Sequence, residues 1–141
     1  MKAPGLHYTL NDGFALALHP QDPAIVAVAT SEGLFVSRDH GERFIKANAD
    51  GEGLSVLFDL EGKYLWHSSF DGRPNLIRVP LGDGNPVQIS LPPLNDDAVA
   101  YIAQNPARRL EFAIATFERS VYLTKDAGQS WHWIADRGTA K

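Results

Sequence analysis

One stretch of sequence decides the fold: Thr124-Lys125-Asp126-Ala127-Gly128-Gln129-Ser130-Trp131. It has an earlier counterpart in Ser37-Arg38-Asp39-His40-Gly41-Glu42-Arg43-Phe44. Both read hydroxyl-x-Asp-x-Gly-x-x-aromatic, and each follows one short apolar run and precedes another. An Asp side chain closes a bend by accepting backbone N–H groups, and a Gly supplies the positive φ of a tight hairpin. The aromatic residue then begins the next strand and packs over the turn.

Short apolar runs bounded by turn-forming residues occupy most of the chain, which favours strands over helices. They fall into three groups of four: 14–18, 25–29, 34–36 and 44–46; 54–58, 64–67, 76–79 and 87–90; 99–103, 112–116, 121–123 and 131–134. Asp39 and Asp126 are 87 residues apart, and Pro20 and Pro106 are 86 apart. Half of this spacing is about 43 residues, which is typical of one propeller blade.

The two quoted stretches resemble the Asp box, or BNR repeat, of sialidase-like, sortilin-like and photosystem II assembly factor-like β-propellers. The resemblance implies an all-β fold of three four-stranded antiparallel blades, at roughly 12–50, 51–94 and 95–137. It also implies a structural role, remote from any active site, for Ser37, Asp39, Gly41, Phe44, Thr124, Asp126, Gly128 and Trp131. The turn at 81–86 keeps an Asp and a Gly but lacks the hydroxyl and the aromatic residue, so the second blade resembles a TolB-type blade instead.

Three blades are too few to close a ring, because propellers use roughly four to eight. We therefore expect either a second copy of the chain that completes a six-bladed ring, or further blades from a longer propeller of which this chain is a fragment. An open arc would otherwise leave apolar sheet faces in water.

Composition excludes several functional classes. Lys and Arg total 13 against 17 Asp and Glu, a net charge of -4, so we expect no nucleic-acid partner. The chain has no Cys, and its Met1-Lys2-Ala3-Pro4-Gly5 start leads into no apolar leader, so we expect no export signal and no membrane association. The compartment stays open: cytoplasmic as the sequence stands, periplasmic or secreted if it is truncated. We expect no cofactor.

Successive turns of a blade alternate between the two faces of a propeller, and binding sites usually form where loops converge. The face opposite the Asp-box turns should carry the loops at 11–13, 31–33, 47–53, 69–75, 92–97 and 117–120. Charged residues there include Asp50 and Asp97. The candidate ligand-binding residues are Glu32, Asp71, Arg73, Asp96, Glu118 and Arg119.

No catalytic or metal-binding constellation is evident. A resemblance to sialidases would imply a cluster of arginines, a nucleophilic Tyr paired with a Glu, and an Asp acid. Only Arg73 and Arg119 are suitably placed for such a cluster, on the face opposite the Asp-box turns. The five His residues are isolated, so we expect no metal site. Trp66, Trp131 and Trp133 could stack on a sugar, although packing is the expected role for Trp66 and Trp131.

The sequence therefore predicts a non-enzymatic binding or assembly module with a protein ligand. The alternative is a glycan-binding, lectin-like protein or a degenerate relative of sialidases and other glycosidases.

Overall fold

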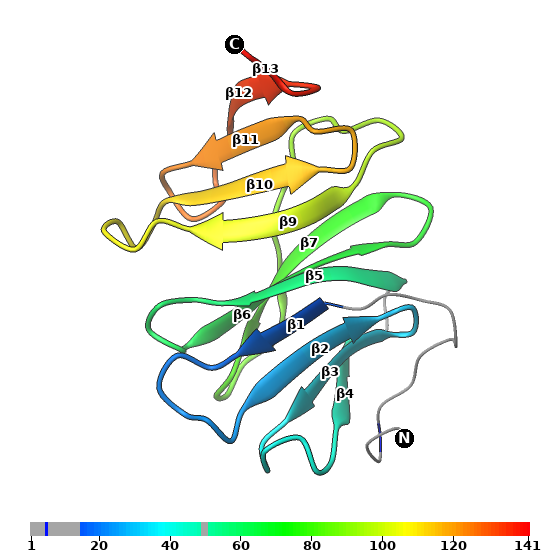
Figure 1. The fold of residues 1–141 in the computed structure, drawn as a ribbon, viewed down its shortest axis with the longest axis vertical. Helices are drawn as coiled ribbons and strands as arrows, with labels where there is room; N and C mark the ends of the chain where they lie inside the picture. Colours follow the sequence, from blue (N-terminus) through cyan, green and yellow to red (C-terminus); the bar gives the residue numbers. More distant parts are fainter. Residues whose placement is uncertain (1–4, 6–14, 49–50) are drawn as a thin grey trace.

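Thirteen strands make up the regular structure of the computed structural model, which describes Gly5, residues 15–48 and residues 51–141 (Figure 1). They are β1 (Ala15–Leu18), β2 (Val26–Thr30), β3 (Gly33–Ser37), β4 (Ile45–Asn48), β5 (Glu52–Phe58), β6 (Tyr64–Phe70), β7 (Pro74–Pro80), β8 (Val87–Gln88), β9 (Val99–Gln104), β10 (Phe112–Thr116), β11 (Val121–Thr124), β12 (His132–Asp136) and β13 (Thr139–Ala140). The described residues contain no helix, so none that could span a membrane.

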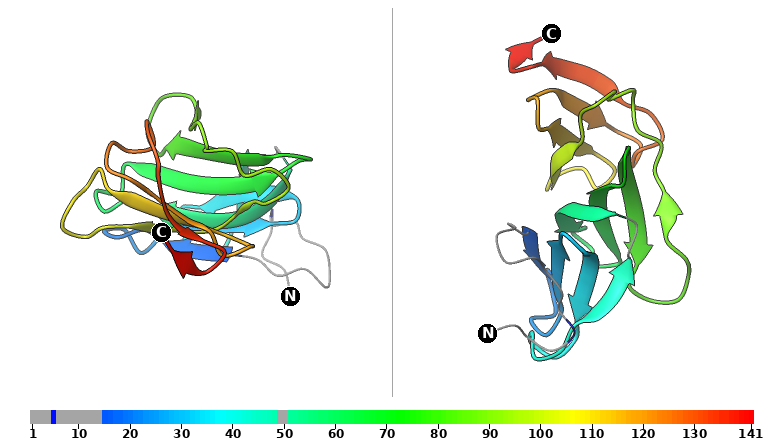
Figure 2. Two further views of the ribbon diagram at one scale, coloured as in Figure 1. Left: turned by 90° about the horizontal axis from the view of Figure 1, so that it is seen from above. Right: turned by 90° about the vertical axis from the view of Figure 1, so that its right-hand side faces the viewer.

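The strands form three antiparallel sheets, each built from one continuous part of the chain. Sheet A has the order β1-β2-β3-β4, sheet B the order β5-β6-β7-β8, and sheet C the order β9-β10-β11-β12-β13. The sheets follow one another along an open arc (Figure 2, right). Contacts between sheets concentrate on their first strands, since β5 lies against both β1 and β9. This is the fan arrangement of propeller blades, with the first strands innermost.

Sheets A and B pack a face of small residues against a face of large ones. Ala17 pairs with Ala27, and Ala27 pairs with Val36, so these three side chains share one face of sheet A. Together with Leu34 they pack on Phe58 and Leu65 of sheet B. Small side chains on one sheet let the larger ones of the next approach closely and fill the space without voids.

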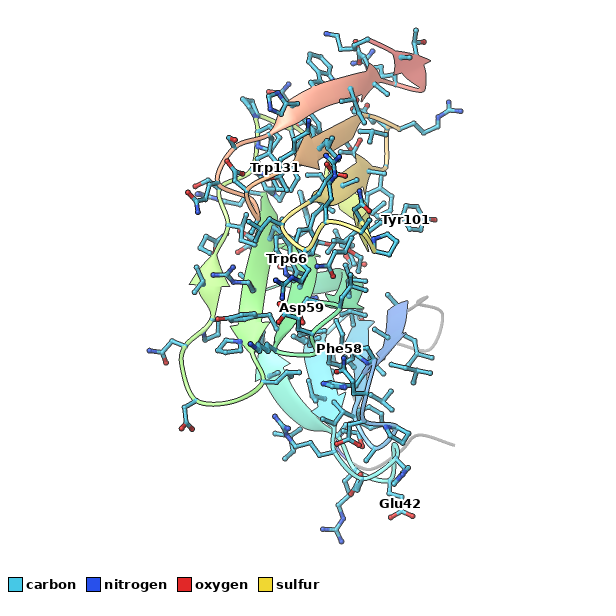
Figure 3. All side chains as sticks on the ribbon, turned by 90° about the vertical axis from the view of Figure 1, so that its left-hand side faces the viewer. Glu42, Phe58, Asp59, Trp66, Tyr101 and Trp131 are labelled. Atoms are coloured by element: carbon cyan, nitrogen blue, oxygen red, sulfur yellow. The ribbon has the colours of Figure 1, made fainter. Side chains whose placement is uncertain are left out.

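The core between sheets B and C is aromatic. The Trp66 and Phe112 rings stack with centroids 4.0 Å apart, and Trp66 is only 1% exposed. Trp131 packs on the same cluster, and its Nε1 donates to the Ser90 carbonyl at 2.9 Å. Trp66 and Trp131 are therefore packing residues that join two sheets (Figure 3).

Turns on one face of the arc are also linked across the sheets. His19 Nε2 donates to the Gly62 carbonyl at 2.9 Å, while its Nδ1 accepts from the backbone N–H groups of Gln21 and Asp22. Further along, the Leu60 N–H donates to Oε1 of Gln104 at 2.8 Å. These hydrogen bonds hold the β1–β2, β5–β6 and β9–β10 connections next to one another.

The stretches Ser37–Phe44 and Thr124–Trp131, here called the Asp–Gly turns, have the same hydrogen-bond network. In the first, Ser37 Oγ donates to Asp39 Oδ1 at 2.8 Å and accepts from the Gly41 N–H at 2.9 Å. In the second, Thr124 Oγ1 donates to Asp126 at 2.7 Å and accepts from the Gly128 N–H at 2.9 Å. Asp39 and Asp126 each also accept a backbone N–H four residues further on, at 2.9 and 2.8 Å. One further bond links each turn to a distant segment: the His40 N–H donates to the Ala24 carbonyl at 3.0 Å, and the Ala127 N–H donates to the Leu110 carbonyl at 2.9 Å.

Two consecutive left-handed residues make each bend. His40 and Gly41 have φ of 64° and 85°, and Ala127 and Gly128 have φ of 57° and 92°. The sequence predicted the glycine conformation but not that of the residue before it.

Other differences from the sequence predictions are small. The strand β13 was not predicted; it pairs with β12 through a hairpin at Arg137 and Gly138, both with positive φ. The turn at 11–13, residue Phe14 and Asp50 lie outside the described residues.

Replacing Gly128 with Ala is expected to destabilise the fold more than replacing Gly41. Both glycines have positive φ, so either substitution costs roughly 1 kcal/mol. A Cβ on Gly128 would also lie 2.6 Å from Ile89 Cγ2, whereas one on Gly41 meets nothing within 4 Å. Overpacking adds about 1–3 kcal/mol. Urea unfolding of the two variants measures the difference, and equal losses would contradict it.

The stabilising effect of Asp126 is expected to depend on pH. Hydrogen bonds from Ser130 and Thr124 lower the pKa of Asp126 to about 2 from its usual 3.8. Because the folded state disfavours protonation, this stabilisation is complete above the ordinary pKa and is lost as pH falls from about 4 to about 2. The free energy of unfolding of Asp126→Asn should therefore approach that of the wild type in acid, measured by urea titration at several pH values. Asp83→Asn, in an exposed hairpin, is the control; a pH-independent difference for Asp126→Asn would refute the expectation.

Candidate functional site

The turns divide between two faces of the arc. The Asp–Gly turns connect β3 to β4 and β11 to β12, on the face that also carries the β1–β2, β5–β6 and β9–β10 connections. The opposite face carries the β2–β3, β6–β7 and β10–β11 turns and the link between β8 and β9. The six candidate ligand-binding residues, all exposed, occupy these elements: Glu32, Asp71 and Arg73, Glu118 and Arg119, and Asp96 in the link.

Two of these elements meet beside sheet C. Asp97 of the link is 7% exposed, and its Oδ1 accepts the backbone N–H groups of Ala98 at 2.8 Å and Glu118 at 3.2 Å. The Phe117 N–H donates to the Ala98 carbonyl at 3.2 Å. Asp97 therefore fixes the β10–β11 turn to the link.

The β12–β13 hairpin is joined to the same turn. The Gly138 N–H donates to the Arg119 carbonyl at 2.8 Å, and the Arg137 N–H donates to Ser120 Oγ at 3.3 Å. Three separate segments thus hold one another in place, which gives this face a preorganised surface.

A pocket of about 730 Å³ lies among these three segments and the strands β11 and β12, and we call it the link pocket. Its polar lining includes Asp97, Glu118, Asp136 and Arg137, and its aromatic lining is Tyr122, Trp131 and Trp133. The Tyr122 and Trp133 rings stack with centroids 5.8 Å apart and planes 13° apart. Burial, followed by the negative charges of Asp136 and Asp97, raises the pKa of Tyr122.

The structure brings only part of the predicted set to this pocket. Glu118 lines it, whereas Glu32, Asp71, Arg73, Asp96 and Arg119 do not. Sequence reasoning missed Tyr122, Asp136 and Arg137 as site residues and considered Trp133 only for sugar stacking. The pairing of Tyr122 with Trp133 across β11 and β12 could have signalled an aromatic face, but the register was not fixed by the sequence.

The described residues give little support to an arginine cluster, a metal site or sugar stacking by Trp66. Arg73 and Arg119 lie in turns of different sheets, and Arg38 donates to the Leu81 carbonyl on the opposite face. No group of three His, Asp or Glu side chains within residues 15–48 and 51–141 could hold a metal ion. Trp66 is too buried to stack on a sugar, while Trp133 is 43% exposed.

Comparison with solved structures identifies the fold. YCF48 bound to a D1 peptide matches with a TM-score of 0.68 and 18% identity, over 96% of this chain and 46% of that one. YCF48 from Cyanidioschyzon merolae matches with a TM-score of 0.69 and 20% identity, over 88% of this chain and 37% of that one. An ancestral GH74 enzyme matches with a TM-score of 0.75 and 15% identity, over 96% of this chain and 20% of that one. No family model and no curated protein matches the sequence.

These likenesses show a β-propeller fold, of which the chain forms a part. The chain spans less than half the length of each of these structures. Because they include both YCF48 and GH74 enzymes, fold similarity does not distinguish a binding protein from an enzyme.

Proposed function

We propose that the chain is a non-enzymatic, Asp-box type propeller module that binds protein through the face opposite the Asp–Gly turns. The observation that carries this is the mutual fixing of the link, the β10–β11 turn and the β12–β13 hairpin around the link pocket. A preorganised surface loses less conformational entropy on binding, which favours affinity. One similar structure, YCF48, is bound to a D1 peptide, which agrees with protein binding by this fold.

The glycan-directed alternative draws on the GH74 likeness and on the exposed Trp133. Its weakness is the charge of the pocket, where three carboxylates face one guanidinium. A carboxylate pair alone does not make a glycosidase site without an acid of raised pKa beside it.

Selection of peptides from a random library on the purified chain tests the proposal. Peptides that bind are expected to lose at least about tenfold in affinity, or ~1.4 kcal/mol, to the variant Glu118→Lys/Arg119→Glu. The matched control is Glu42→Lys/Arg43→Glu, because it reverses an adjacent exposed acid–base pair on the opposite face. Equal loss in both variants, or saturable glycan hydrolysis by the chain, would contradict the proposal.

We also propose that a second copy completes the ring. The face of sheet C away from sheet B consists mainly of small apolar residues, with Ala103, Ala113 and Leu123 in register, and no described strand of another sheet packs on it. By repeat position they correspond to Ala17, Ala27 and Val36, which sheet A packs against sheet B. The open face of sheet C therefore has the character of a face that receives the next blade.

The matching surface in the second copy is the far face of sheet A. Leu16 and Leu18 lie there, 62% and 66% exposed, in register with Val28 and Val26. Sheet C packs on sheet B through Ile102, Ile114 and Tyr122. The equivalent positions of the repeat in sheet A are Leu16, Val28 and Phe35. The open face at each end of the arc therefore resembles one of the two kinds of sheet face that pack together inside the arc.

Solution mass is expected to be twice the 15.5 kDa of one chain. Ala113→Arg should yield folded monomers, because it places a charge at the centre of the proposed contact, whereas Val87→Arg on the outer strand β8 should leave the mass unchanged. A wild-type monomer would refute the second copy and favour blades supplied by a longer chain.

A further inference from the structure

Two of the three carboxylates of the link pocket, those of Glu118 and Asp136, lack partners of their own. Among the described residues, Glu118 and Asp136 form no ion pair and their side chains accept no hydrogen bond, although Arg137 lines the same pocket. Asp97 uses its Oδ1 for backbone groups. Two carboxylates therefore remain available to a ligand in the pocket.

The aromatic side chains beside them present ring surfaces rather than donors. The Trp133 indole N–H donates to the Ala135 carbonyl at 2.8 Å, and that of Trp131 donates to Ser90. With both N–H groups occupied, the indoles offer the pocket only their π systems, whose negative faces attract cations.

The chain itself demonstrates this attraction. Lys141 Nζ lies 3.6 Å from the centroid of the Trp133 ring. Because Lys141 already covers the Trp133 ring and Tyr122 stacks on it, a second cation would be held by the carboxylates of the pocket rather than by this ring. The pocket volume of about 730 Å³ exceeds what one lysine or arginine side chain needs.

We infer that the link pocket binds the cationic side chain of a lysine or arginine from a partner protein. Asp136 and Glu118 supply the charge, and the aromatic lining of Tyr122, Trp131 and Trp133 packs along the apolar stem. The inference rests on the proposed function, to which it adds the chemistry of the ligand. It differs from a glycan site because a cation gains a charge–charge attraction to the carboxylates, whereas a neutral sugar gains only hydrogen bonds.

Titration of the ¹⁵N-labelled full chain, followed by NMR, tests this inference with three matched probes. They are N-acetyl-lysine methylamide, N-acetyl-arginine methylamide and the uncharged N-acetyl-norleucine methylamide. One or both cationic probes should shift the Trp133 indole signal and the Asp136 and Glu118 amides, and norleucine should not. Asp136→Asn should weaken binding about three- to tenfold, as one screened charge contact implies, and added salt should weaken it further. Asp83→Asn removes an equal charge from an exposed hairpin and is the control.

The outcomes separate this inference from the proposed function. Equal binding of norleucine and lysine, no shifts at all, or tighter binding of a neutral oligosaccharide at Trp133 would overturn the cation site. If selected peptides still bind the loop face without a basic residue, the proposed function stands and the cation site fails. If the lysine probe binds and no peptide can be selected, the cation site stands and protein binding fails.

Discussion

The face-to-face packing of neighbouring sheets is the interaction on which the rest of this structure depends. The small face of sheet A accepts Phe58 and Leu65, and the aromatic face of sheet C stacks Phe112 on Trp66. Such an aromatic pair contributes about 0.5–1.5 kcal/mol beyond its burial. A single four-stranded sheet has no interior, so each sheet forms a hydrophobic core only by packing against its neighbour. Because the short turns are closed by their own side chains, the sheet faces remain available to pack against neighbouring sheets.

The link pocket is a by-product of the same packing. The chain must cross from the outer strand of sheet B to the inner strand of sheet C, and Asp97 fixes that crossing against the β10–β11 turn. Because Trp131 also reaches the Ser90 carbonyl, one wall of the pocket is tied to each sheet. The walls of the pocket are therefore held by the contact between the sheets.

Local chemistry explains which features could be predicted from the sequence. The side-chain hydrogen bonds that close the two Asp–Gly turns involve only residues within one stretch. The strands alternate within one stretch too, which is why the positions of both followed from spacing alone. The pocket involves segments that are distant in sequence. Asp96 and Asp97 are adjacent acids in one link, yet Asp96 is exposed and Asp97 is buried. What separates them is a turn in which Asn95 has a φ of 57° and the Asp97 N–H returns to the Leu94 carbonyl. No pattern in the sequence distinguishes the two.

The unlike ends of the arc have a consequence for assembly. A contact between two different surfaces is heterologous, so it leaves one of each surface free on every growing oligomer until the ends meet. Closure after two chains requires each sheet to turn by roughly 60° relative to the last. A smaller turn would add chains into wider rings, and a turn combined with a shift along the axis would give a helical fibre. The side chains that set the angle between neighbouring sheets, Trp66 and Trp131 among them, would then decide whether growth stops.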